Sequence, residues 1–110
     1  MYRSDEVLVK DICDCIDESL GIVEGMSYRD LYDDRIRQYA LIRLLEIIGE
    51  AANQMSADFK DKNPEIPWKK MIAMRNRLIH GYFSVNPEIV WDTVNTDLPY
   101  LRKILSCDEL

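Results

Sequence analysis

The chain has 110 residues, of which 47% are hydrophobic and 31% are charged, and its formal net charge is −6. This composition is typical of one soluble globular domain over residues 1–110, and it excludes a disordered chain. No apolar run approaches the roughly 18 residues that a membrane span needs, and the polar N-terminus does not resemble a signal peptide, so we expect a cytoplasmic protein with no membrane association.

The first third of the chain predicts one long helix and one short helix. Ser4 followed by two acidic residues is typical of a helix start, and apolar residues then recur at helical spacing over residues 5–25. Ser27 is expected to begin a short helix whose Leu31 and Tyr32 face inward.

The middle of the chain predicts the most apolar helix, over residues 35–54. A helix that is apolar on most sides is either central to a bundle or paired with another subunit. Glu46 and Glu50 lie one turn apart on it, and a buried carboxylate needs a cationic partner, for which Arg75 and Arg43 are both candidates.

Residues 57–67 contain two prolines and predict a connection, after which residues 67–80 fit a further helix. Gly81 is well placed to end that helix in a left-handed cap. A last helix begins at Asn86, and Pro99 should kink or break it. With no alternating strand pattern, the sequence predicts an all-α fold, a four-helix up-and-down bundle with an additional short helix.

Three cysteines, Cys13, Cys15 and Cys107, make an odd count. Cys13 and Cys15 are too close on a helix to pair well, and only one histidine is available to complete a metal site. We therefore expect buried or idle thiols rather than a disulfide or a zinc centre, and neither a metal nor a cofactor.

Charge is distributed unevenly along this acidic chain. Residues 1–34 carry three basic and ten acidic groups, whereas residues 67–82 carry four basic groups and no acidic one. Lys69, Lys70 and Arg77 belong to this basic segment and are candidates for binding the phosphates of a nucleic acid. The alternative, that they form an ordinary solvated helix face, is supported equally well by charge alone.

The only histidine, His80, lies in the same basic segment, five residues after Arg75. Histidine exchanges a proton near neutral pH, and the planar fork of arginine suits a phosphate. On a helix Asn76 shares a face with His80, whereas Arg75 is about 140° away, so Asn76 is the expected hydrogen-bond neighbour of His80. The alternative is that Arg75 and His80 merely finish a helix and that Tyr82 packs over its end.

The segment Arg75-Asn76-(three residues)-His80-Gly81-Tyr82 resembles the Arg-x4-His-x-Tyr motif of the HEPN superfamily, and more narrowly its HepT-like group. Residues 47–52, 66–68 and 90–91 also resemble that group in order and spacing, so that the resemblance covers nearly the whole chain.

The resemblance implies a homodimer with a cleft shared by two subunits, acting as a metal-independent endoribonuclease toxin on an RNA substrate. A partner nucleotidyltransferase antitoxin would silence it by adding AMP to a tyrosine. Carried over to this chain, His80 would be the general acid and base, Arg75 the phosphate ligand, Asn76 an orienting residue and Tyr82 the AMPylation target. Two alternatives are a non-catalytic nucleotide- or RNA-binding partner subunit of a nucleotidyltransferase and a purely structural dimerisation module.

Overall fold

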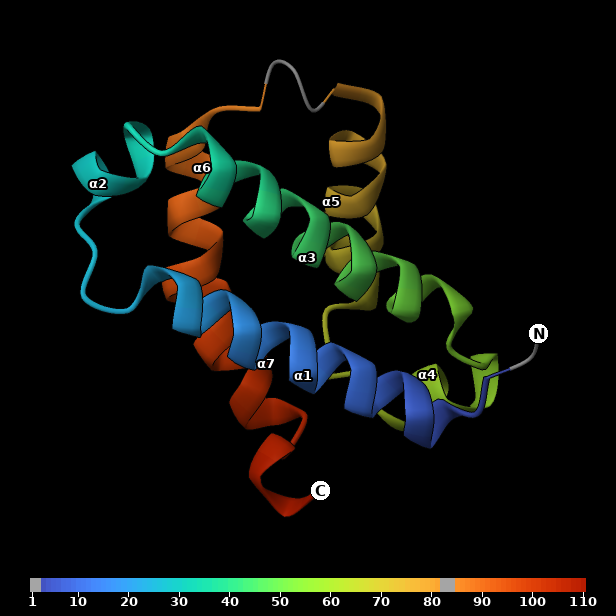
Figure 1. Cartoon of the computed structure of the whole chain (residues 1–110). Helices are drawn as coiled ribbons and strands as arrows, with labels where there is room; N and C mark the ends of the chain where they lie inside the picture. Colours follow the sequence, from blue (N-terminus) through green and yellow to red (C-terminus); the bar gives the residue numbers. More distant parts are fainter. Residues whose placement is uncertain (1–2, 82–84) are drawn as a thin grey trace.

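The computed structural model describes residues 3–81 and 85–110, and these residues contain helices and no strand (Figure 1). In chain order the elements are α1 (Asp5–Val23), α2 (Tyr28–Tyr32), α3 (Arg35–Gln54), α4 (Ala57–Lys62), α5 (Trp68–Gly81), α6 (Pro87–Asp92), the π-helical turn η2 (Thr93–Asp97), α7 (Leu98–Ile104) and the 3-10 turn η3 (Cys107–Glu109). The prediction of an all-α fold is confirmed, and the long helices begin close to the predicted residues.

Side-chain caps explain where the first two helices begin. The Ser4 hydroxyl accepts a hydrogen bond from the Val7 backbone N–H at 3.2 Å. Ser27 and Asp30 each accept a hydrogen bond from the other's backbone N–H, which is a complete capping box. Because the first N–H groups of a helix have no partner within it, these caps fix its start.

The helices form two layers around one core. Helices α1 and α3 lie side by side and run in opposite directions, while α5 and the continuous helix α6–η2–α7 cross behind them (Figure 1). The fully or almost fully buried side chains come from both layers and include Ile12, Ile16, Leu41, Leu78, Val90 and Val94. The crossing places α5 directly against α3, and this contact positions the candidate site. The predicted up-and-down arrangement of four helices is not confirmed.

One prediction about the shorter segments is wrong, and one short helix was not predicted. Leu31 is fully buried, but Tyr32 is exposed, because a helix of five residues buries only one side and the Tyr32 ring lies under the Arg29 guanidinium instead. Residues 57–62, within the predicted connection, form the additional helix α4, since the Ser56 hydroxyl caps it by accepting from the Phe59 N–H at 3.1 Å.

The predicted effect of Pro99 on the last helix takes the form of a wide turn. The π-helical turn η2 ends at Asp97, two residues before Pro99. The helix widens here because the proline ring clashes with the carbonyl four residues earlier and proline has no N–H to donate. The Thr93 hydroxyl donates to the Ile89 carbonyl at 2.8 Å, and the Asn95 amide donates to the Trp91 carbonyl at 2.9 Å. The helix is therefore widened but not interrupted.

A disulfide joins Cys13 of α1 to Cys107 of η3, with Cα atoms 5.7 Å apart, so the prediction that both are idle thiols is wrong. The two residues are 94 positions apart, and they meet only because η3 lies against α1; spacing along the chain cannot reveal such a contact. Cys15 is a buried free thiol, as expected. None of the described helices is long and apolar enough to cross a membrane.

Candidate functional site

Helix α5 carries the predicted site and is anchored along one side. The Trp68 indole N–H donates to the Asn63 carbonyl at 3.0 Å, and the side chains of Met71 and Leu78 are buried against the core. With this side held, the opposite side of α5, including His80, faces solvent.

Gly49 of α3 allows α5 to approach closely. A Cβ atom at this position would lie 2.2 Å from the Cβ of Arg75 and 2.7 Å from the backbone oxygen of Met71. Both distances are far below van der Waals contact, so any side chain at position 49 would push α5 away. Because residue 49 has no side chain, the backbone of α5 at Arg75 can lie directly against α3.

The Arg75 guanidinium is held by two oxygen acceptors. Nη2 lies 2.6 Å from Oε2 of Glu50 on α3, and Nη1 donates to Oδ1 of Asn76 at 2.7 Å. The second oxygen of Glu50 accepts from the Gln54 amide at 3.1 Å. The Arg75 side chain is 25% exposed, and its Nε is buried without a hydrogen-bond partner among the described residues. Arginine is thereby presented at the surface in one orientation.

Asn76 therefore pairs with Arg75 within the described residues, not with His80 as expected from helix periodicity. The long arginine side chain bends back to its sequence neighbour, which helical spacing alone does not predict.

His80 occupies the last turn of α5, and its side chain is exposed. Five helical residues separate it from Arg75 by about 7.5 Å along the axis and about 140° around it. Gly81 is the last residue of α5, and the predicted cap borders on residues that are not described. Tyr82 lies outside the described residues.

Two of the three further basic residues, Lys70 and Arg77, share one side of α5, because seven residues make almost two whole turns, and Lys69 lies on another side. Lys69 shares a stripe with Asn76 and His80, since these positions follow one another at intervals close to whole turns. Lys70 forms an ion pair with Asp97 at 3.7 Å, and Arg77 is about 200° from Arg75 around the axis. Lys69 thus continues the exposed side that carries Asn76 and His80, and Arg77, which is also exposed, lies beside His80 one turn earlier.

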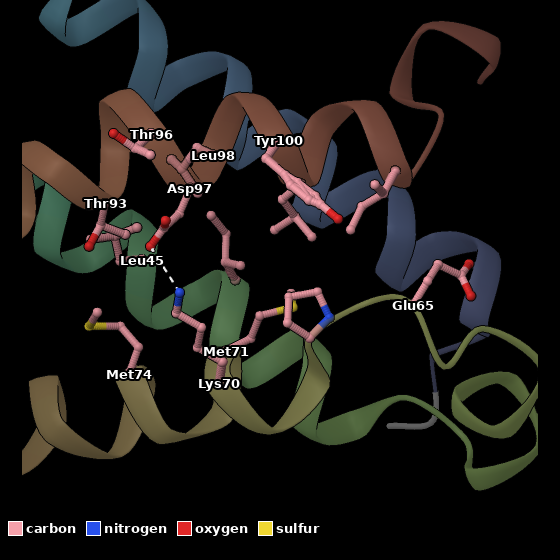
Figure 2. A pocket seen from close by; sticks show the side chains of 14 residues that line it. Leu45, Glu65, Lys70, Met71, Met74, Thr93, Thr96, Asp97, Leu98 and Tyr100 are labelled. Carbon is pink, nitrogen blue, oxygen red and sulfur yellow. Dashed lines mark ion pairs between the residues drawn. The ribbon is translucent and has the colours of Figure 1, made fainter.

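An apolar groove of about 470 Å³ lies between α5 and α7, and Arg75 is not among its lining residues (Figure 2). Its walls include Met71 and Met74 of α5 and Leu98 of α7, and the Lys70–Asp97 ion pair spans it (Figure 2). A second hollow, of about 270 Å³, lies between α1 and α3 and has both charged and apolar side chains in its lining, Glu50 among them.

Sequence reasoning left the partners of Glu46 and Glu50 open and did not include either in the site. Glu50 pairs with Arg75, whereas Glu46 pairs with Arg43 at 3.2 Å. One feature of the sequence could have indicated Glu50 as a site residue: it is a carboxylate directly after Gly49 on the most apolar helix. Groups of three or more His, Cys, Asp or Glu residues able to hold a metal ion do not occur in residues 3–81 and 85–110.

The fold and site define an all-helical protein in which one helix presents an arginine, an asparagine and a histidine, and a neighbouring helix holds the arginine. The ribonuclease HepT-like family matches residues 12–107 of this chain. The chain belongs to that family, which confirms the resemblance found in the sequence.

Two relatives span almost the same length. A protein of Thermococcus cleftensis named "probable ribonuclease HepT" is 41% identical over 102 residues, which are 93% of each chain. A protein of Methanocaldococcus jannaschii named as a "putative RNase" is 35% identical over 101 residues, 92% of this chain and 93% of its own. No solved structure matches the chain.

Proposed function

We propose that this protein is a metal-independent endoribonuclease that acts as the toxin of a toxin–antitoxin pair. The observation that carries the proposal is the Arg75 guanidinium, held at the surface by Glu50 and Asn76 one and a half helical turns before the exposed His80. Membership of the ribonuclease HepT-like family and the names of the relatives support an RNA substrate.

The chemistry uses groups that these residues supply. The RNA 2′-hydroxyl loses its proton to a base and attacks the adjacent phosphorus, the bond from phosphorus to the 5′-oxygen breaks, and that oxygen takes a proton from an acid. His80 serves as the base or the acid, and the fixed charge of Arg75 stabilises the extra negative charge on the phosphate. The products are a 2′,3′-cyclic phosphate and a 5′-hydroxyl.

A homodimer would complete this site, because one chain has one histidine and the reaction needs two proton transfers. Exposed apolar side chains lie on the two helices that carry the site: Ile36 (82% exposed) and Tyr39 on α3, and Ile79 on α5. On α3 these residues share a side with Glu50 by helical spacing. Pairing of two chains through this surface would bury the apolar side chains and bring two Arg75–His80 pairs to one cleft.

Tyr82 is the proposed regulatory residue. A partner nucleotidyltransferase antitoxin would transfer AMP to its hydroxyl, and the added negative charge and bulk beside His80 would repel and block RNA. The support is the sequence motif, in which the tyrosine follows the histidine by two residues.

The second candidate is a non-catalytic nucleotide- or RNA-binding subunit of that transferase. The acidic N-terminal third of the chain favours it, because ten acidic and three basic groups over residues 1–34 offer a negative surface to a partner protein, while the basic groups of α5 suit a nucleotide or RNA.

Cleavage of RNA in the presence of EDTA tests the proposal. Wild-type protein free of AMP should cleave, and His80→Ala and Arg75→Ala should each lower kcat/KM by about 100-fold or more. Arg29→Ala is a matched control, because Arg29 also forms an ion pair with a carboxylate but lies on α2. Equal cleavage by His80→Ala and wild type would contradict the proposal, whereas RNA binding without cleavage by wild type would establish the second candidate.

A further inference from the structure

The carboxylate of Glu50 joins α3 to the Arg75 guanidinium, with Oε2 2.6 Å from Nη2. Arginine has five N–H donors in a rigid plane. Glu50 accepts from Nη2 and Asn76 accepts from Nη1, so both ends of the plane are held from different directions. This arrangement leaves the guanidinium little freedom to rotate.

The Glu50 carboxylate is itself held in place. Its other oxygen accepts from Gln54 one turn later on α3, and residue 49 before it is pressed against the backbone of α5. The Arg43–Glu46 pair on the same helix is different, because Arg43 is largely exposed and its partner lies on its own helix. Ordinary exposed ion pairs contribute little, but a pair that bridges two helices through a half-buried arginine restricts geometry.

We propose that Glu50 is a positioning residue of the active site: it holds Arg75 in the orientation that receives the scissile phosphate, and its negative charge at the same time weakens the binding of that phosphate. The inference rests on the proposed ribonuclease function. RNA would use the remaining N–H groups on the terminal nitrogens of Arg75, so that Glu50 stays bound while the phosphate binds.

The two roles predict different effects on kcat and KM. Glu50→Ala removes the contact, so kcat should fall by about 10- to 100-fold through misorientation of Arg75. Glu50→Gln keeps an oxygen that accepts from Nη2 but removes the charge. Its kcat should stay within about threefold of wild type, and its KM for RNA should fall because the phosphate no longer competes with a carboxylate.

Steady-state cleavage of a short RNA by the full chain should be measured for wild type, Glu50→Ala and Glu50→Gln. Glu46→Gln and Glu46→Ala are matched controls, since Glu46 lies one turn away on α3 and pairs with Arg43. Both control variants should keep kcat and KM within about twofold of wild type, because their carboxylate does not contact the site. Circular dichroism and thermal unfolding of each variant separate a loss of fold from a loss of orientation.

The outcomes distinguish this inference from the proposed function. If wild type cleaves RNA and Glu50→Ala has an unchanged kcat, the positioning role is refuted while the ribonuclease function stands. The proposal assigns the orientation of Arg75 to the Glu50 contact and the competition with phosphate to the Glu50 charge. This assignment is overturned if Glu50→Gln has a kcat as low as that of Glu50→Ala, or if Glu46→Gln lowers KM as much as Glu50→Gln does. If wild type binds RNA and does not cleave it, the proposed function fails and this inference fails with it.

Discussion

The close approach of α5 to Gly49 yields a quantitative prediction for Gly49→Ala. The new methyl group would lie 2.2 Å from the Arg75 Cβ, where carbon atoms normally stay about 3.5–4.0 Å apart, and 2.7 Å from the Met71 carbonyl oxygen. Because one of these neighbours is backbone, α5 must shift as a whole. Overpacking costs about 1–3 kcal/mol, and the contact with backbone puts this variant in the upper part of that range, at about 2–3 kcal/mol. The better helix propensity of alanine offsets about 1 kcal/mol of this cost.

We therefore expect Gly49→Ala to lower the free energy of unfolding by about 1–2 kcal/mol, which is a fall in Tm of roughly 4–10 °C. Gly21→Ala is the matched control: Gly21 also lies inside a helix, but nothing is within 4 Å of a Cβ atom there, so this variant should gain up to about 1 kcal/mol. Urea unfolding followed by circular dichroism at equal protein concentration measures both. A Gly49→Ala protein as stable as wild type would refute the packing argument.

Three further predictions concern groups away from the site. Reduction of the Cys13–Cys107 disulfide, or Cys107→Ser, should lower the free energy of unfolding by about 2–4 kcal/mol, and an unchanged urea midpoint would show that the disulfide does not form in solution. Burial, with nearby acidic side chains, raises the pKa of the Cys15 thiol to about 11, so alkylation of the native protein at pH 8 followed by mass spectrometry should label it far more slowly than a free thiol. Hydrogen bonds from Ser56 lower the pKa of the Asp5 carboxyl group. The ionised carboxylate therefore stabilises the fold above the ordinary carboxyl pKa, and this contribution is lost as the pH falls through the lowered pKa. Urea unfolding should show that Asp5→Asn loses less stability than wild type between pH 5 and pH 3.

Periodicity and caps made the long helices predictable from the sequence. Ser4, Ser27 and Asn86 each cap the helix that begins after it, and apolar residues at helical spacing continue to the observed ends. The wide turn before Pro99 could be anticipated as a disturbance but not as a π-helical turn. That outcome depends on how the helix packs, since Thr93 and Val94 of this turn are buried, and packing against other helices cannot be derived from the spacing of residues.

Contacts between distant residues were not predictable in the same way. The Cys13–Cys107 disulfide depends on where η3 folds, and the exposure of Tyr32 depends on how little of α2 meets the core. In the candidate site the sequence predicted the motif residues Arg75 and His80 but not the Asn76 hydrogen bond to arginine, because side-chain bending is invisible to helical spacing.

Two neighbouring residues of α3, Gly49 and Glu50, contribute to the placement of Arg75 on α5. Gly49 and Glu50 are adjacent and therefore point about 100° apart on α3. The first lets the backbone of α5 approach, and the second reaches around to the end of the arginine that this approach brings within 2.6 Å. Each is ineffective without the other, because a larger residue 49 would move the guanidinium out of reach of the carboxylate. The double variant Gly49→Ala/Glu50→Ala should therefore lose little more kcat than the more damaging single variant.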